Sequence, residues 1–318
     1  MDGEMLVFGG SGSPELTRSI CEYLGRDPGE SEVLKFSEGN LFVRVLENVR
    51  GRHVFVVQST AFPANDNFME LLFWIDAFKR ASAASVTAVM PYFGYAKGDK
   101  KDEPRVSIRA RVCADCIEAA GADRVVTMDL HAAQIQGFFR VPVDDLYALP
   151  VLCEAVREEG LEDLIVVSPD TGFAKQARKY ATYLGLDLAI GDKERMGHDE
   201  QAQVMEIIGE VQGRTALVVD DFTISGGTLV DVAEKLVERG AREVWAALSH
   251  GVFAEGSMEK IAASPIRRLL VTDTVETQPV EFCDKVEVIS VAPLFGEAIK
   301  RIYGRESVSV LFPKKKTP

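Results

Sequence analysis

Residues 217–229, LVVDDFTISGGTL, join an apolar strand, two carboxylates and a glycine-containing loop to the start of a helix. Asp220 and Asp221 end the strand, where ligands bind in parallel α/β sheets, and carboxylates there can accept hydrogen bonds from a vicinal diol. Glycine lets the loop backbone approach an anion closely, and the following helix points free N–H groups and its positive end at that anion. The loop consists of Ser225, Gly226, Gly227 and Thr228. The combination predicts a site for the phosphate and hydroxyl groups of a phosphorylated ribose.

A simple glycine turn before an acid-capped helix is the alternative interpretation of such a loop. A Gly-Gly pair alone would favour that alternative. Here the apolar strand, the paired aspartates and the Ser-Gly-Gly-Thr loop occur together, and this combination favours an anion site.

Short β-branched runs alternate with helical stretches along nearly the whole chain. Near-continuous apolar strands separated by helices are typical of parallel sheets that are covered on both faces, so the predicted fold class is α/β. Strands are expected at residues 5–8, 54–58, 86–90, 124–128, 164–168, 216–220, 244–248 and 268–272. Helices are expected at residues 67–82, 105–120, 147–159, 172–184 and 227–239.

The chain of 318 residues is long for one domain and suits two α/β lobes. A boundary near residues 146–150 divides it into comparable parts. We therefore expect a first lobe at residues 1–147 and a second at 148–292. A C-terminal helix and tail, residues 293–318, could return to the first lobe.

The composition restricts the partners and the location of the protein. There are 49 acidic and 36 basic residues, for a net charge of −13 and a pI near 4.9. This excess of negative charge repels nucleic acid and anionic membranes, so neither is expected as a partner. No apolar run approaches the ~20 residues of a membrane span, and the N-terminus lacks the features of a leader, so a cytoplasmic location is expected. Five cysteines argue against a disulfide framework, and the pair Cys113 and Cys116 is expected to pack as small hydrophobic residues.

The loop at 219–228 resembles the phosphoribosyl-binding motif of type I phosphoribosyltransferases and of ribose-phosphate diphosphokinases. Other segments resemble the second family alone, in order over essentially the whole chain. They are residues 56–102, 127–139, 142–150, 166–172, 192–195, 203–211 and 306–312. The resemblance implies two tandem type I phosphoribosyltransferase-like lobes with parallel sheets. It also implies transfer of the diphosphoryl group of Mg–ATP to the C1 hydroxyl of ribose 5-phosphate, which gives 5-phosphoribosyl 1-diphosphate and AMP.

The resemblance also implies catalytic and metal-binding residues. Lys193 matches the family's catalytic lysine, and Arg195 matches the arginine two residues further on. Both are expected to stabilise charge on the transferring group, as cations do in phosphoryl transfer. His131 and Asp170 match residues that meet Mg²⁺ and the ATP phosphates, and Asp129 is expected to assist. Such a sparse set suits Mg²⁺, which usually keeps several waters.

Nucleotide-binding residues are implied in the first lobe. Phe36 matches an aromatic residue that lies against adenine, and Glu38 and Asn40 stand where the family contacts the adenine edge. Lys97 replaces an arginine that contacts ATP, and Gly98 replaces a glutamine. The charged loop after Tyr95 is expected to close over the site and exclude water. Its residues include Lys100, Lys101, Asp102 and Arg105.

Several positions depart from the common family pattern. Ile224 removes a third acid of the loop, which leaves open the group that deprotonates the C1 hydroxyl, and Phe173 replaces a glycine. At the positions of the family's phosphate and ADP regulatory site, matches and replacements are mixed, so weak dependence on phosphate is expected. The matching residues are Arg50, Gln136, Ser307, Ser309 and Phe312, and the replacements are Asn48, Ala133 and Asp145.

Two other functions are compatible with parts of this pattern. One is a catalytically silent homologue that assembles with the synthetase, and the other is a type I phosphoribosyltransferase. The presence of Lys193, Arg195, His131 and Asp170 favours an active enzyme. By resemblance, we expect a homo-oligomer, based on dimers and often a hexamer, that binds ribose 5-phosphate and ATP.

The altered positions Glu38, Asn40 and Gly98 predict selectivity for the nucleotide donor that is relaxed or shifted away from strict ATP, because the hydrogen-bonding groups around the base differ from the family pattern. Assays with ATP, GTP, CTP and UTP at equal concentration should show activity with a donor other than ATP. Strict dependence on ATP would contradict this prediction.

Overall fold

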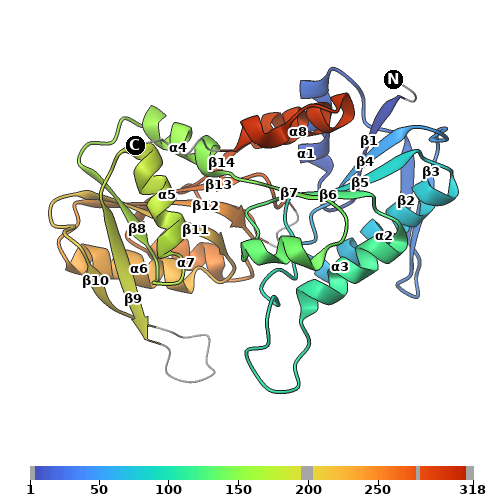
Figure 1. The fold of residues 1–318 in the computed structure, drawn as a ribbon. Helices are drawn as coiled ribbons and strands as arrows, with labels where there is room; N and C mark the ends of the chain where they lie inside the picture. The colour runs from blue at the N-terminus through green and yellow to red at the C-terminus, as the bar shows by residue number, and fades with distance from the viewer. Residues whose placement is uncertain (1–3, 195–202, 277–279, 313–318) are drawn as a thin grey trace. The chain divides into compact units, whose positions relative to one another are not determined.

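The computed structural model describes residues 4–194, 203–276 and 280–312. The chain divides into two compact units (Figure 1). The first lobe comprises residues 1–147, 274–277 and 290–318, and the second comprises 148–273 and 278–289. Residues 290–318 thus belong to the first lobe, together with a short segment after the last long strand of the second.

The first lobe is built on a five-stranded parallel sheet in the order β1-β4-β5-β6-β7. Helices α1 and α8 cover one face and α2 and α3 the other (Figure 1). The strands are β1 (Met5–Gly9), β4 (His53–Val57), β5 (Ser85–Met90), β6 (Arg124–Met128) and β7 (Val143–Leu146), and the helices are α1 (Pro14–Leu24), α2 (Ala64–Arg80), α3 (Arg109–Ala120) and α8 (Ala292–Gly304). An antiparallel hairpin, β2 (Ser31–Lys35) and β3 (Leu41–Val45), stands outside this sheet, and 3-10 turns lie at η1 (Ala133–Phe138) and η2 (Val308–Leu311).

The second lobe has a seven-stranded sheet in the order β10-β9-β8-β11-β12-β13-β14, parallel except for β10. Its strands are β8 (Leu164–Ser168), β9 (Leu188–Glu194), β10 (Gln203–Ile208), β11 (Thr215–Thr223), β12 (Glu243–Gly251), β13 (Ile266–Thr272) and β14 (Val286–Ile289). Helices α6 (Gly227–Glu238) and α7 (Ser257–Ala263) lie on one face, and α4 (Leu149–Glu158) and α5 (Ala174–Leu184) on the other (Figure 1).

The α/β class and the parallel sheets predicted from sequence are confirmed. The long apolar strands were predicted within a few residues, because continuous burial gives them an unmistakable composition. The hairpin β2–β3 and the strands β7, β9, β10 and β14 were missed, since their partly exposed residues lack that signal. Helices α1 and α7 were missed as well. All five cysteines are free, and Cys113 is buried as expected.

The start of α1 is closed by side chains of the protein itself. The backbone N–H groups of Glu15 and Leu16 donate to the two carboxylate oxygens of Glu276, at 2.8 and 2.6 Å. Just before the helix, Ser11 N–H donates to Glu70 Oε1, at 2.8 Å. Carboxylates therefore already satisfy the positive end of α1, through a contact between residues 260 positions apart.

Replacing Glu276 by alanine should lower the free energy of unfolding by about 1–2 kcal/mol, because two N–H groups at the helix start lose their acceptor. Glu276→Gln should cost less, since one acceptor oxygen remains. Thermal unfolding of the purified variants measures both effects. The exposed Glu281→Ala is a control from the same region, and equal loss in the control and in Glu276→Ala would contradict the capping role.

Candidate active site

The predicted phosphate loop lies at the carboxyl end of β11, in the middle of the second sheet. β11 pairs with β8 only as far as Val218, but with β12 as far as Thr223. The end of β11, which carries Asp220 and Asp221, therefore extends beyond its β8 neighbour. The sheet topology places the two carboxylates at the edge where ligands bind in parallel sheets.

The start of α6 is open, in contrast to the start of α1. Gly226 has φ of 75°, a left-handed conformation that favours glycine, and its carbonyl accepts from Val230 N–H. The N-cap residue Gly226 has no side chain to cap α6, and no acidic residue lies in the first turn. Ser225 is exposed, and its hydroxyl oxygen accepts a long hydrogen bond from the Gly227 N–H, at 3.4 Å. The loop and the helix start thus offer donors and positive potential to an anion.

Three carboxylates gather beside this loop. Burial, the neighbouring Asp221 and then Asp170 raise the pKa of Asp220 well above its ordinary value. The Asp221 backbone N–H donates to Asp220 Oδ1 at 2.9 Å, which partly offsets this rise. The mutual repulsion favours ligands that donate hydrogen bonds or carry positive charge, such as sugar hydroxyls or a hydrated cation.

Asp170 is held rigidly at the end of β8. Its Oδ1 accepts from Phe173 N–H at 2.9 Å, and its backbone carbonyl accepts from the Ser168 hydroxyl at 2.7 Å. Phe173, where the family pattern has a glycine, is the residue that precedes α5, and its N–H fixes the Asp170 side chain. Asp170 is thereby presented in a fixed orientation beside the Asp220–Asp221 pair.

The three carboxylates Asp170, Asp220 and Asp221 form a sparse set of oxygen donors that suits Mg²⁺. Its oxygen ligands are hard and anionic, which Mg²⁺ prefers. Within the described part of the chain, however, there is no group of three or more Asp, Glu, His or Cys side chains that could hold a metal ion by itself. A metal bound here would consequently rely on water and on substrate phosphates for most of its ligands, as Mg²⁺ commonly does.

Asp129 and His131 occupy a tight turn after β6 in the first lobe. Asp129 has φ of 42°, which is unusual for a residue other than glycine, and its N–H donates to the Leu146 carbonyl at 2.9 Å. Leu130 N–H donates to Asp145 Oδ1 at 3.1 Å, and Asp145 is only 3% exposed. The turn is therefore pinned to the edge strand β7, which leaves His131 exposed beyond it.

Asp145 thus has a role that sequence reasoning missed. The sequence placed it among residues that weaken anion binding, whereas the structure buries it beneath the turn that carries Asp129 and His131. The signal was the alternation in VDDL, which sends Asp144 to pair with Arg124 and Asp145 to the opposite face.

The predicted adenine-binding residues meet at the tip of the β2–β3 hairpin. Phe36 is 47% exposed and its ring lies 6.1 Å from that of Phe42. The Asn40 amide donates to Glu38 Oε1 at 3.3 Å, and Phe36 N–H donates to the Asn40 carbonyl at 2.8 Å. An exposed ring flanked by an amide and a carboxylate is suited to stacking and edge recognition of a base.

The charged loop begins close to the hairpin. Lys35 at the end of β2 pairs with Asp66, and the Tyr95 hydroxyl donates to Asn65, so both segments are fixed to the first turn of α2. Within the loop, four of the predicted ATP-binding residues are exposed and one, Gly98, is buried. The exposed residues are Lys97, Lys100, Lys101 and Asp102.

Lys193 is the penultimate residue of β9 and pairs with Val204 of β10. Its side chain, and Arg195 altogether, lie outside the described residues. Their catalytic roles stay predictions, as do the roles assigned above to the other site residues.

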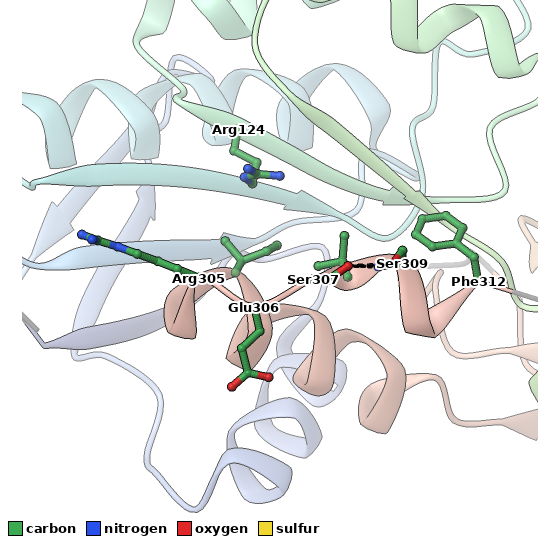
Figure 2. Close-up of a pocket in the computed structure, with 8 residues that line it drawn as sticks. Arg124, Arg305, Glu306, Ser307, Ser309 and Phe312 are labelled. Atoms are coloured by element: carbon green, nitrogen blue, oxygen red, sulfur yellow. Dashed lines mark hydrogen bonds between the residues drawn. The ribbon is translucent and has the colours of Figure 1, made fainter.

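A cavity of about 470 Å³ lies where α8 leads into η2 in the first lobe (Figure 2). Arg124, Arg305, Ser307, Ser309 and Phe312 line it, and the hydroxyls of Ser307 and Ser309 lie 2.6 Å apart. Three of the family's regulatory positions therefore line one cavity. Asn48, Ala133 and Asp145 are not among its lining residues.

The fold and the site define a class: two-lobed α/β proteins with a glycine-containing loop that follows the central strand of the second lobe. Comparison with protein families agrees. Residues 5–121 match the N-terminal domain of ribose phosphate pyrophosphokinase, and residues 196–313 match the phosphoribosyl synthetase-associated domain.

Individual relatives match over nearly their full length. The ribose-phosphate pyrophosphokinase of Caldanaerobacter subterraneus is 50% identical over 96% of this chain and 97% of its own. That of Rhizobium meliloti is 47% identical over 97% and 100%. The crystal structure of phosphoribosylpyrophosphate synthetase from Mycobacterium smegmatis superposes with a TM-score of 0.89 at 36% identity, covering 95% of this chain and 99% of that one. The chain belongs to the ribose-phosphate pyrophosphokinase family, and the enzyme class predicted from its motifs is confirmed.

Replacing Asp145 by alanine should destabilise the first lobe by about 1–3 kcal/mol, because Leu130 N–H is left without an acceptor in the core. Asp145→Asn keeps an acceptor oxygen and should cost much less. Thermal unfolding measures the loss of stability. Hydrogen exchange of the Leu130 amide reports directly on its bond to Asp145. Asp144→Ala is the control, and a Leu130 amide that stays protected in Asp145→Ala would contradict the role.

Replacing Asp220 by asparagine should raise stability at pH 7. The folded state raises the pKa of Asp220, so it binds the proton more tightly than the unfolded state does. Stability therefore falls as pH rises from the ordinary carboxyl pKa to the raised one, and asparagine removes that fall. Melting temperatures at pH 4 and pH 7 test this sign, and an equal shift at both pH values would contradict it.

Proposed function

We propose that the protein transfers the diphosphoryl group of Mg–ATP to the C1 hydroxyl of ribose 5-phosphate, using the residues assigned above. In this proposal the loop Ser225–Thr228 and the start of α6 hold the 5-phosphate. Asp220 and Asp221 accept hydrogen bonds from the ribose hydroxyls. Lys193 and Arg195 stabilise the charge that develops on the transferring group.

The observation that carries the assignment of the sugar site is the start of α6, which has a glycine N-cap and no acid in its first turn, shortly after a strand that carries two aspartates near its end. Phosphate oxygens satisfy N–H groups at a helix start, and carboxylates at strand ends bind sugar hydroxyls. Gly227, the first residue of α6, follows Asp220 by seven residues in the sequence.

The nucleotide is assigned to the first lobe. Phe36 stacks on the base, while Glu38 and Asn40 contact its edge. Lys97, Lys100 and Lys101 attract the polyphosphate, with Gly98 and Asp102 shaping the loop that carries them. Candidate Mg²⁺ ligands are assigned in each lobe by itself, with His131 and Asp129 in the first and Asp170 in the second. Mg²⁺, when bound, would neutralise charge on the phosphates and orient them.

The family and the net charge support a proposal for the location, the oligomeric state and the partners of the protein. We propose a cytoplasmic homo-oligomer built from dimers, with ribose 5-phosphate and ATP as its small-molecule partners and without nucleic acid or membrane partners. No helix in the described ranges is long and apolar enough to cross a bilayer.

Incubation with ribose 5-phosphate and Mg–ATP should yield AMP and 5-phosphoribosyl 1-diphosphate in equal amounts, resolved by anion-exchange chromatography. Lys193→Ala should lower kcat on the order of 10²–10³-fold, because a cation at the transition state is lost. Lys260→Ala, an exposed lysine on α7, is the control.

Absence of both products would overturn the proposed reaction. A Lys193→Ala enzyme with the kcat of the control would instead overturn the role given to this lysine.

A further inference from the structure

Arg109 is the first residue of α3 and directly follows the charged loop of the first lobe. Its side chain is exposed. Its surroundings are nevertheless unlike those of an ordinary surface arginine.

The charge of Arg109 stands at the electrostatically unfavourable end of its helix. A helix start carries partial positive charge, so a cation there is repelled unless an acid lies nearby. The first turn of α3 contains no acidic residue. Among the described residues, Arg109 has no ion pair or hydrogen bond from its guanidinium. Arg111, two residues further on, instead pairs with Asp115 at 2.5 Å.

Gly98 makes the room that the Arg109 side chain occupies. A Cβ on Gly98 would lie 2.6 Å from Arg109 Nε and 2.8 Å from Arg109 Cβ, closer than real Cβ contacts. The Gly98 carbonyl also accepts from Ala110 N–H at 3.1 Å, which fixes the loop to the first turn of α3. Any side chain at position 98 would therefore displace the arginine, the loop or both.

The loop beside Arg109 adds further positive charge. Lys97, Lys100 and Lys101 are exposed on it, whereas the carboxylate of Asp99 accepts from the Gln134 amide at 3.2 Å. Asp102 and Glu103 are exposed on the same loop, yet residues 97–109 hold five basic and three acidic residues in a protein of net charge −13. This local excess of cations indicates an anionic ligand. Arginine alone among these cations offers a planar fork that can bind phosphate oxygens in pairs.

We infer that the Arg109 guanidinium, whose side chain lies in the room that Gly98 leaves, binds the polyphosphate of the nucleotide donor. This inference deepens the proposed function and rests on the nucleotide assigned to the first lobe. Arg109 then supplies the forked contact that a lysine at position 97 cannot make. The bound phosphates in turn neutralise the charge at the start of α3.

The test measures binding of a non-hydrolysable Mg–ATP analogue by calorimetry, together with KM for ATP and for ribose 5-phosphate. Arg109→Ala should weaken analogue binding and raise the KM for ATP by about tenfold, the loss of one charge-assisted contact. The KM for ribose 5-phosphate should stay within twofold. Arg109→Lys should fall between the wild type and Arg109→Ala.

Two further variants separate binding from structure. Gly98→Ala retains Arg109 but displaces its side chain, so it should also weaken analogue binding. Arg140→Ala removes another exposed arginine of the first lobe and should bind the analogue as the wild type does. The melting temperature of ligand-free Arg109→Ala should equal or exceed that of the wild type, because a repelled cation leaves the helix start.

Analogue affinity within twofold of the wild type in Arg109→Ala would overturn the inference. An equal rise in the KM for ATP and the KM for ribose 5-phosphate would also overturn it. The same holds if Arg109→Ala melts at a lower temperature than the wild type and this loss of stability accounts for the weaker binding. Because the calorimetry needs no turnover, it tests Arg109 even if the proposed reaction fails. Suppose that the wild-type enzyme makes the products and that Arg109→Ala binds the analogue normally. This result would overturn the inference on Arg109 and leave the proposed function unchanged.

Discussion

The positive end of a helix needs negative charge, and the two lobes of this protein meet that need differently. In the first lobe the N–H groups at the start of α1 donate to the carboxylate of Glu276, and the preceding loop donates to Glu70. In the second lobe the N-cap of α6 is a glycine and its first turn contains no acidic residue. A helix start without an acid of its own favours an external anion. The proposed placement of the sugar phosphate depends on this difference.

The binding site carries an electrostatic cost before any ligand arrives. Asp220, Asp221 and Asp170 crowd together, and the raised pKa of Asp220 reflects both burial and the neighbouring carboxylates. In the first lobe, Arg109 lies unpaired against the positive end of α3. Each lobe thus keeps an unfavourable charge. In the second lobe, hydroxyl donors or cations can relieve the repulsion between the carboxylates. In the first lobe, phosphates can relieve the positive charge of Arg109. Sites that bind ligands commonly retain such local strain at the expense of stability.

Sequence reasoning was most successful where the physical signal is local. Continuous apolar runs predicted the central strands, and the Asp-Asp and Ser-Gly-Gly-Thr pattern located the loop at the end of β11. The contacts that the sequence did not predict join distant residues: Glu276 with α1, Asp145 with Leu130, and Gly98 with Arg109. The alternation in VDDL predicts the face on which Asp145 lies, but no periodicity or spacing names the partner in any of these contacts, because the topology brings the residues together. The hairpin tip with Phe36 was found only through the family resemblance, since its strands are short and half exposed.

The central claim is that the open start of α6 binds the sugar phosphate and that the closed start of α1 does not. Calorimetric titration with ribose 5-phosphate, in the presence of Mg²⁺ and a non-hydrolysable ATP analogue, tests it directly. The account predicts one site per chain, and it predicts loss of binding in Thr228→Glu, which places an acid in the first turn of α6 as Glu15 lies in that of α1. Two sites per chain, or undiminished affinity in Thr228→Glu, would contradict it.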